Sequence, residues 1–219
     1  MASWLTHLRV AERIKQKVSE IDFQYLIIGS IAPDSGVPDE SRMDYTPSKD
    51  ITHCKYQNDS CIADMNETVF FDSYLVPEKI MIRSDNTRSF LWGYYFHLIT
   101  DKLWLEECFR PFQKSYENEF QNPDKDFVNL IREEMFSLDF EYIKEKGPML
   151  INELNNFDGS INFFYEFDSD YIYECKNRIV EFYSAKPLTL DREYKYLNSQ
   201  IIEEFIAKAA DKCISILIV

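Results

Sequence analysis

Glycine is scarce in this 219-residue chain, which has five glycines against 17 phenylalanines and 14 tyrosines. Tight turns depend on glycine wherever the backbone takes a positive φ, so a turn-rich β architecture is disfavoured. Hydrophobic residues make up 45% of the chain. At this length they can form a core that needs neither a disulfide nor a metal to hold it together.

The cysteines do not follow the spacing of a metal site or a disulfide framework. There are five of them, widely separated, and no two form a CxxC pair. Zinc sites with sulfur ligands and disulfide-stabilised secreted domains are recognised by such spacings. We therefore expect reduced thiols in a cytoplasmic protein.

Long apolar runs and an excess of positive charge are also missing. No stretch approaches the roughly 18 apolar residues that predict a transmembrane segment, and residues 1–9 lack the pattern of a secretion signal. With 24 basic against 38 acidic residues, the formal net charge is −14. Because binding to duplex nucleic acid needs Lys and Arg to neutralise phosphates, we expect no such partner. A small phosphorylated substrate stays open, and the composition does not decide the oligomeric state.

Helical periodicity is the dominant pattern in the chain. Residues 4–18 place apolar side chains every three or four positions, with Ser3 as N-cap. Residues 23–31 form a shorter apolar run that Pro33 and Gly36 end. Further helices are expected at 66–75, 86–114, 124–145, 148–156, 168–185 and 193–217, and residues 155–165 could hold a short strand. The sequence thus predicts an all-α fold, a single-domain multi-helix bundle over residues 1–219.

Residues 35–60 are expected to form a long loop, because they are polar and rich in Pro, Ser and Asp. Loops longer than about 12–15 residues are uncommon in compact domains unless they are functional or disordered. The presence of His53 in this loop favours a functional role.

His97 and Asp101 are the strongest indication of a site in a chain with three histidines. They stand four residues apart in the helix expected at 86–114, so their side chains lie on one face. Apolar neighbours predict that both are buried, and a buried carboxylate needs a counter-charge or a metal. Zinc accepts both kinds of ligand. A simple His–Asp hydrogen bond would also give this spacing, and more often.

The other candidate residues mean little one by one. His7 lies on the apolar side of the first helix, where a histidine is more often a core or surface residue than a ligand. Asp34 follows Pro33, as a turn or cap residue would, and His53 alone is simply a loop residue. Only the joint pattern indicates a function.

That joint pattern resembles the zinc-dependent phospholipase C and fungal single-strand nuclease superfamily, and most of all its small cytoplasmic bacterial relatives. The matching segments occur in the family's order: residues 4–8 (WLTHL), residues 29–35 (GSIAPDS), His53 in the following loop, and residues 93–104 (GYYFHLITDKLW). They span about the first half of the chain. The second half resembles the family only in being helical.

The resemblance implies a metal centre in a fold like that of zinc-dependent phospholipase C. Asp34, His53, His97 and Asp101 would surround one zinc, and Asp101 would bridge to a second zinc that also binds His7. Asp34 would double as the catalytic residue that accepts the proton of the attacking water. In the family an N-terminal Trp amine also binds the second zinc. Here Trp4 follows three residues, so that contact would be lost.

A third zinc, as found in the secreted enzymes of the family, would need two further histidines that the chain lacks. Glu107 falls near the first missing ligand, and later carboxylates could supply oxygens: Asp124, Asp126, Glu133 and Asp139. Such a replacement would favour Mn²⁺, Fe or Mg²⁺ over zinc.

The resemblance predicts a hydrolase that uses one or two metal ions to activate water against a phosphate ester, whether a phosphodiester, a phospholipid or a phosphomonoester. No GxxxxGK[ST] or GxGxxG motif suggests a nucleotide-binding fold instead. The alternatives are a non-catalytic metal-binding or ligand-sensing domain, and a relic held by His–Asp hydrogen bonds. Four tyrosines either line a substrate pocket or belong to the core and its rim, the second being the simpler reading: Tyr45, Tyr56, Tyr94 and Tyr95.

Overall fold

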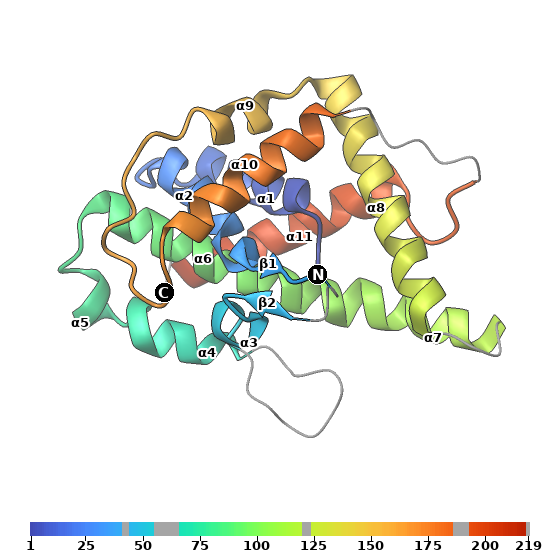
Figure 1. Cartoon of the computed structure of the whole chain (residues 1–219), viewed down its shortest axis with the longest axis horizontal. Helices are drawn as coiled ribbons and strands as arrows, with labels where there is room; N and C mark the ends of the chain where they lie inside the picture. Colours follow the sequence, from blue (N-terminus) through green and yellow to red (C-terminus); the bar gives the residue numbers. More distant parts are fainter. Residues whose placement is uncertain (41–43, 55–65, 120–123, 186–192, 218–219) are drawn as a thin grey trace.

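Helices make up 74% of the structure and strands 2%, which confirms the prediction of an all-α fold. The computed structural model describes residues 1–40, 44–54, 66–119, 124–185 and 193–217. The elements follow one another in this order (Figure 1): α1 (Trp4–Lys17), α2 (Phe23–Ile31), η1 (Ala32–Ser35), β1 (Val37–Pro38), β2 (Tyr45–Thr46), α3 (Lys49–Thr52), α4 (Glu67–Phe70), η2 (Phe71–Leu75), α5 (Pro77–Ile80), α6 (Asp85–Trp104), η3 (Leu105–Phe109), α7 (Arg110–Glu119), α8 (Asp124–Lys146), α9 (Met149–Asn155), α10 (Asp170–Ser184) and α11 (Ser199–Leu217).

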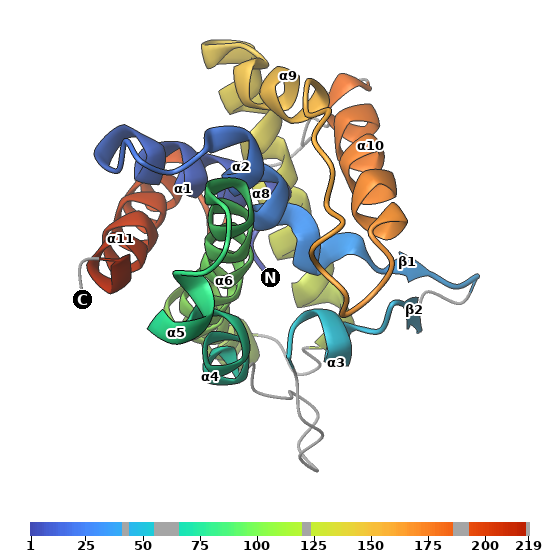
Figure 2. The ribbon, with the colours of Figure 1, turned by 90° about the vertical axis from the view of Figure 1, so that its left-hand side faces the viewer.

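Helix α6 is the centre of the fold. It packs against α1, α2, α4 and α11, and Figure 2 shows it with α2 above it and α1 and α11 to one side. Buried side chains line it on all sides from Thr87 to Asp101. A helix that is apolar nearly all round is stable only when other elements cover every face. Its His97 and Asp101 are therefore presented inside the molecule, as their sequence context predicts.

Two glycines allow α2 and α6 to touch backbone to backbone. A Cβ at Gly93 would lie 2.3 Å from the carbonyl oxygen of Leu26, and a Cβ at Gly29 would lie 2.2 Å from that of Phe90. Both distances are far below van der Waals contact with atoms that cannot rotate away. This close crossing brings the carbonyl of Ser30 within hydrogen-bonding distance of His97.

Gly93→Ala is expected to lower the free energy of unfolding by about 3 kcal/mol, the upper range for overpacking a well-packed core. The methyl group must push α2 away from α6, which should also weaken the hydrogen bond between His97 and the Ser30 carbonyl. Urea unfolding measures the change in the free energy of unfolding. Arg88→Ala, an exposed change on the same helix, should stay within about 0.5 kcal/mol of wild type. Equal stabilities of the two variants would contradict the close crossing.

The start of α1 is anchored by residues from the second half of the chain. Ser3 caps the helix by accepting from the Thr6 amide, as predicted, and its hydroxyl donates to Asp139 of α8 at 3.0 Å. The other oxygen of Asp139 accepts from the Tyr183 hydroxyl of α10 at 2.6 Å. Burial raises the pKa of Asp139 to about 7. These contacts fix the N-terminal segment that leads into His7.

The helix expected at 86–114 is interrupted rather than continuous. It ends at Trp104 and continues through the π-helical turn η3 into α7. Pro111, at the second position of α7, has no N–H to donate and its ring crowds the preceding turn. A single wider turn just before it accommodates both effects.

The helix expected at 193–217 begins later, at Ser199. The cause is the buried carboxylate of Glu134 on α8, which accepts the backbone N–H groups of Lys195, Tyr196 and Leu197 at 2.7, 3.0 and 3.0 Å. Because these three N–H groups point at α8, residues 195–197 do not form the first turn of a helix, and α11 begins only after them. The stretch at 155–165 contains no strand either; in the described part of the chain, strand is confined to β1 and β2 of the loop after η1.

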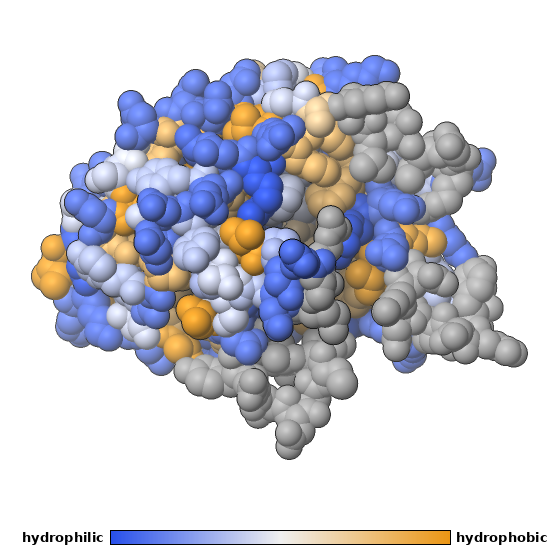
Figure 3. Space-filling view, in the orientation of Figure 1, coloured by the Kyte–Doolittle hydropathy of each residue, from blue (hydrophilic) through white to orange (hydrophobic). Residues whose placement is uncertain are grey.

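The surface is mostly hydrophilic on the face that Figure 3 shows, in keeping with the net charge of −14. Met81 and Ile82, just after α5, are 74% and 80% exposed. Among the described residues, no helix has both the length and the apolar composition that crossing a membrane requires.

Candidate metal centre

The structure brings together the side chains of all five residues that the sequence singles out. His7 comes from α1, Asp34 from η1, His53 from the end of α3, and His97 and Asp101 from α6. Their donor atoms form two overlapping groups, each with all its atoms within 4.8 Å of one another. One group is His7, His97 and Asp101, and the other is Asp34, His53 and His97. This buried His/Asp cluster could hold a metal ion.

Asp101 lies between the three histidines. Its Oδ1 is 3.3 Å from the Nε2 of His7, whereas its Oδ2 is 3.5 Å from the Nε2 of His97 and 3.8 Å from that of His53. On the far side, the Nε2 of His53 is 3.6 Å from Asp34 Oδ1. The two oxygens of one carboxylate therefore face different histidines.

The histidine rings are held by groups outside the cluster. His97 Nδ1 lies 2.8 Å from the Ser30 carbonyl oxygen, which can only accept, so Nδ1 carries a proton and Nε2 of the neutral ring presents a lone pair to the cluster. His53 Nδ1 is 2.9 Å from the hydroxyl of Thr52, and Tyr94 in turn donates to the Thr52 carbonyl at 2.6 Å. Metal-binding histidines are oriented by partners of this kind.

Several polar atoms of the cluster are buried without a hydrogen bond among the described residues. They are the Nε2 atoms of His7, His53 and His97, the Oδ2 of Asp101 and the Nδ1 of His7. Buried polar groups are normally paired, and each unpaired one costs about 1–3 kcal/mol. A cation among these atoms would satisfy most of them at once. Imidazole and carboxylate donors suit zinc and its neighbours.

The electrostatics of the cluster favour neutral His7 and His53 beside ionised carboxylates. Burial and the neighbouring His97 lower the pKa of His7, and burial lowers the pKa of His53. Burial also acts on His97, but the Asp101 carboxylate outweighs it and raises the pKa of that ring. Burial would raise the pKa of both carboxyl groups. The N-terminal amine and the histidines nevertheless hold the pKa of Asp101 below the ordinary value, and His53 and His97 do the same for Asp34.

The metal-free protein is expected to lose stability as the pH falls from 6.5 to 5. His7 and His53 have folded-state pKa values below the unfolded value of 6.5, so in this window the unfolded chain binds more protons. His97, whose folded-state pKa is raised, acts weakly in the opposite direction, because near pH 6.5 the folded protein holds this proton more fully than the unfolded chain does. The two histidines alone would lower the unfolding free energy by about 2 kcal/mol per pH unit. Asp139, whose pKa is raised to about 7 in the folded protein, takes up a proton in the same window and offsets about half of this, so urea unfolding of chelator-treated protein should show a net fall of about 1 kcal/mol per pH unit.

A variant separates this effect from general acid sensitivity. His53→Asn removes one of the two histidines that resist protonation, so its slope between pH 6.5 and 5 should be smaller than the wild-type slope by about 1 kcal/mol per pH unit. An unchanged slope in the variant, or a flat profile in the wild type, would mean that these rings accept protons freely in the folded protein.

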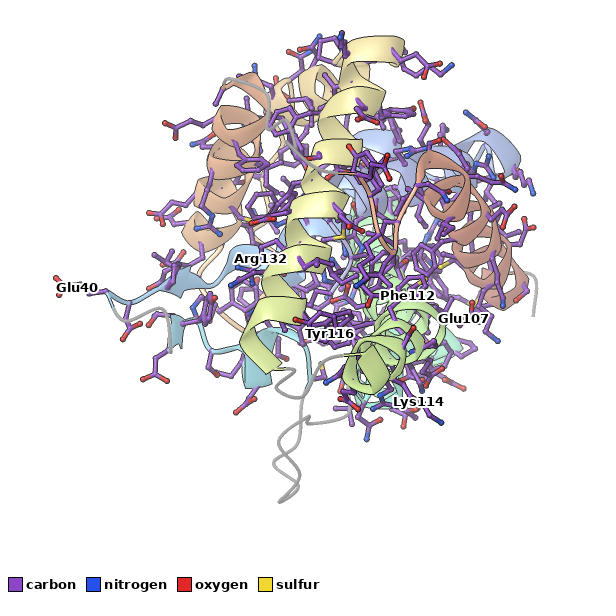
Figure 4. All side chains as sticks on the ribbon, turned by 90° about the vertical axis from the view of Figure 1, so that its right-hand side faces the viewer. Glu40, Glu107, Phe112, Lys114, Tyr116 and Arg132 are labelled. Atoms are coloured by element: carbon purple, nitrogen blue, oxygen red, sulfur yellow. The ribbon has the colours of Figure 1, made fainter. Side chains whose placement is uncertain are left out.

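The carboxylates considered for a third metal do not join the cluster in the described part of the chain. Glu107 pairs with Lys208 at 2.7 Å, and Figure 4 shows it beside α11. Asp139 is bonded to Ser3 and Tyr183, and Glu133 is exposed. The side chains of Asp124 and Asp126 lie outside the described residues. The two ligand groups are thus built from the same five side chains alone.

The N-terminal segment approaches the cluster at a different residue from the one that the family pattern suggests. Trp4 packs edge-on against Phe182 and beside Phe136, with ring centroids 5.6 and 6.1 Å apart. The backbone nitrogen at the cluster is that of Ala2, which donates to Asp101 Oδ1 at 2.8 Å. Sequence reasoning missed this contact, because no residue type marks a main-chain donor.

The tyrosines beside His97 are core residues. Tyr94 and Tyr95 are 1% and 7% exposed, and Tyr94 stacks on Phe70 with ring centroids 4.5 Å apart. Tyr45 is half-buried in β2, and Tyr56 lies outside the described residues. The structure thus favours the core alternative for Tyr94 and Tyr95 over a substrate pocket.

The cluster is closed on the side of α1 and α6. A narrow space beside His7 and His97, lined also by Val10, Leu26 and Phe96, does not admit a water molecule. His7, His53, His97 and Asp101 are each at most 1% exposed. The Asp34 side chain, 7% exposed, is the one that reaches toward solvent.

No protein-family model, curated protein or solved structure matches this chain. The assignment of the cluster therefore depends on its own geometry. Five side chains from four separate segments are buried together, and the Nε2 atoms of the three histidines have no hydrogen-bond partner among the described residues.

Proposed function

We propose that this chain is a metal-dependent phosphoric ester hydrolase whose centre binds one or two divalent ions, most readily zinc, through His7, Asp34, His53, His97 and Asp101. The observation that supports it most is the convergence of three unpaired Nε2 atoms on the carboxylate of Asp101. The family resemblance of the sequence motifs supports the type of reaction, because the same residues occur there in the same order.

The two halves of the cluster offer unequal numbers of ligands. One half has Asp34, His53, His97 and the Oδ2 of Asp101, a set of four that can complete a tetrahedral zinc site. The other half has His7 and the Oδ1 of Asp101. An ion there would keep positions for exchangeable ligands, as catalytic sites do. We therefore expect one ion to bind tightly and a second to bind more weakly.

The protein residues would divide the work as follows. Divalent ions at such a centre supply a water of lowered pKa and positive charge toward the phosphoryl oxygens. Asp34, ionised and the most exposed of the five side chains, would take the proton of the attacking water. Ser30 and Thr52 hold the His97 and His53 rings in place, so the centre needs little rearrangement during the reaction.

A non-catalytic metal-binding domain is the second candidate, and the burial of the cluster favours it. Structural metal sites are typically closed, whereas catalytic ones keep an open position. Four of the five side chains are almost fully buried, and the space beside His7 and His97 is too narrow for water. Such a domain would bind the same metal but would not hydrolyse a substrate.

One experiment separates the two candidates. Metal content per chain is measured by elemental analysis of untagged protein prepared without chelators, and the same sample is assayed with bis(4-nitrophenyl) phosphate and 4-nitrophenyl phosphate. Bound transition metal with turnover supports the hydrolase, and bound metal without turnover of a broad ester panel supports the non-catalytic domain. No metal, even after incubation with zinc or manganese, would overturn both.

A further inference from the structure

Arg178 of α10 lies beside the candidate metal centre without belonging to it. Its Nη2 donates to the carbonyl oxygen of Asp34 at 3.1 Å and to that of Gly36 at 3.4 Å. Helix α10 packs against η1, the turn that includes Asp34, and in Figure 2 it stands next to the segment leading into β1. A guanidinium group is thus placed at the backbone of one of the proposed ligands.

The charge of Arg178 has no carboxylate partner among the residues that the structure describes. Other arginines do: Arg9 pairs with Glu203, and Arg88 with Asp85. The recorded partners of Arg178 are the two carbonyl oxygens and the thiol of Cys175. In a chain with 38 acidic residues, a half-buried arginine that bonds only neutral groups keeps its charge available to an anion.

Arg178 bonds the backbone of the least buried residue of the centre. Four of the five cluster side chains are at most 1% exposed, and Asp34 at 7% is the one that approaches solvent. A ligand that reaches the centre from solvent therefore passes Asp34, the residue whose carbonyl Arg178 bonds. Because Nη2 makes both carbonyl bonds, the hydrogens of the guanidinium group that neither these carbonyls nor Cys175 takes are left for another acceptor.

We propose that Arg178 binds the phosphoryl oxygens of the substrate at the entrance beside Asp34. This inference rests on the proposed function, since it names the group that recognises the anion at the same centre. With a single divalent ion, the two carboxylates of the cluster would cancel its charge, and a further positive charge would then favour the binding of an anion. The planar fork of arginine suits tetrahedral oxyanions, which it can bind through two parallel hydrogen bonds.

The test uses inorganic phosphate as the probe and the metal-loaded full chain. Titration calorimetry of wild type should show phosphate binding, and Arg178→Met should weaken it by about tenfold or more while the metal content stays unchanged. Arg178→Lys, which keeps the charge and loses the fork, should restore part of the affinity. With an ester substrate, the change in Arg178→Met should appear mainly as a higher KM.

Lys176→Met is the matched control. Lys176 lies on the same helix and also bonds backbone carbonyls, those of Asn155 and Phe157 at 3.4 and 3.2 Å, so its loss removes the same charge from a similar setting. It should leave phosphate affinity at the wild-type value. Equal losses in both variants, or no phosphate binding by metal-loaded wild type, would overturn the inference.

Two further results separate this inference from its premise. If Arg178→Met loses metal in proportion to phosphate, Arg178 only supports the turn at Asp34 and the inference is wrong. If wild type binds metal and phosphate, depends on Arg178 for the phosphate, but hydrolyses no ester, the hydrolase proposal fails and Arg178 remains an anion-binding residue.

Discussion

Asp101→Asn is expected to reduce bound metal to less than about a tenth of the wild-type content, a loss of at least 1.4 kcal/mol in binding free energy. Both oxygens of Asp101 face histidine nitrogens, at 3.3 Å for His7 and 3.5 Å for His97. An amide replaces one anionic oxygen with an N–H donor, which cannot bind a cation. Elemental analysis after dialysis against buffered zinc measures the change.

The same variant should remain folded without metal. Asparagine has the shape of aspartate, and its carbonyl oxygen can still accept from the Ala2 amide. Wild type should lose stability when a chelator removes its metal, by about 4 kcal/mol if free metal stood at 1,000 times the dissociation constant. Asp101→Asn should show no such chelator effect, because it has little metal to lose.

Asp139→Asn is the matched control, since Asp139 is also a buried carboxylate but bonds Ser3 and Tyr183 outside the cluster. It should keep its metal even if its stability changes. Full metal content in Asp101→Asn would place the ion elsewhere and remove the basis of the proposed function.

The sequence predicted the parts of this site that depend on local geometry. The spacing of His97 and Asp101 placed both side chains on one helical face, and the apolar residues around them predicted their burial; both hold in the structure. Pro33 and Gly36 predicted the end of α2 at the turn with Asp34. Local rules succeed here because helix periodicity and turn residues are fixed by the nearest neighbours in the chain.

Contacts between distant segments were beyond such rules. The hydrogen bond from His97 to the Ser30 carbonyl depends on the crossing of α2 and α6 at Gly29 and Gly93, and a glycine pair alone does not specify which helices will touch. The placement of Arg178 beside Asp34 joins residues 144 positions apart. No sequence pattern marks an arginine that will bond main-chain carbonyls.

The errors in the predicted helices have the same origin. The late start of α11 follows from the three amides that bond Glu134 of α8, and a glutamate inside a helix gives no sign of such partners.

The resemblance of the sequence motifs brought His7 and His53 into the candidate site. Their own positions, on an apolar helix face and in a loop, would have left them as ordinary residues.

Asp34→Asn is expected to lower kcat by about 10²-fold to 10⁴-fold, the range for losing a general base, while at least one ion stays bound. The asparagine oxygen can still act as a ligand, and His53, His97 and Asp101 complete the set. It cannot take a proton from water. Because the pKa of Asp34 is held low, kcat of the wild type should stay constant to a lower pH than a general base with an ordinary carboxyl pKa would allow. The pH profile of the variant should not show the fall in kcat that protonation of Asp34 causes.

Ser35→Ala tests whether the loss belongs to Asp34 or to its turn. Ser35 is the next residue of η1, and its buried hydroxyl has no hydrogen-bond partner among the described residues, so removing it should leave both metal and rate near wild type. Asp34→Asn with an unchanged rate would reduce Asp34 to a ligand or turn residue. A loss of rate that adding zinc restores would mean that Asp34 serves metal binding alone, and that another group accepts the proton.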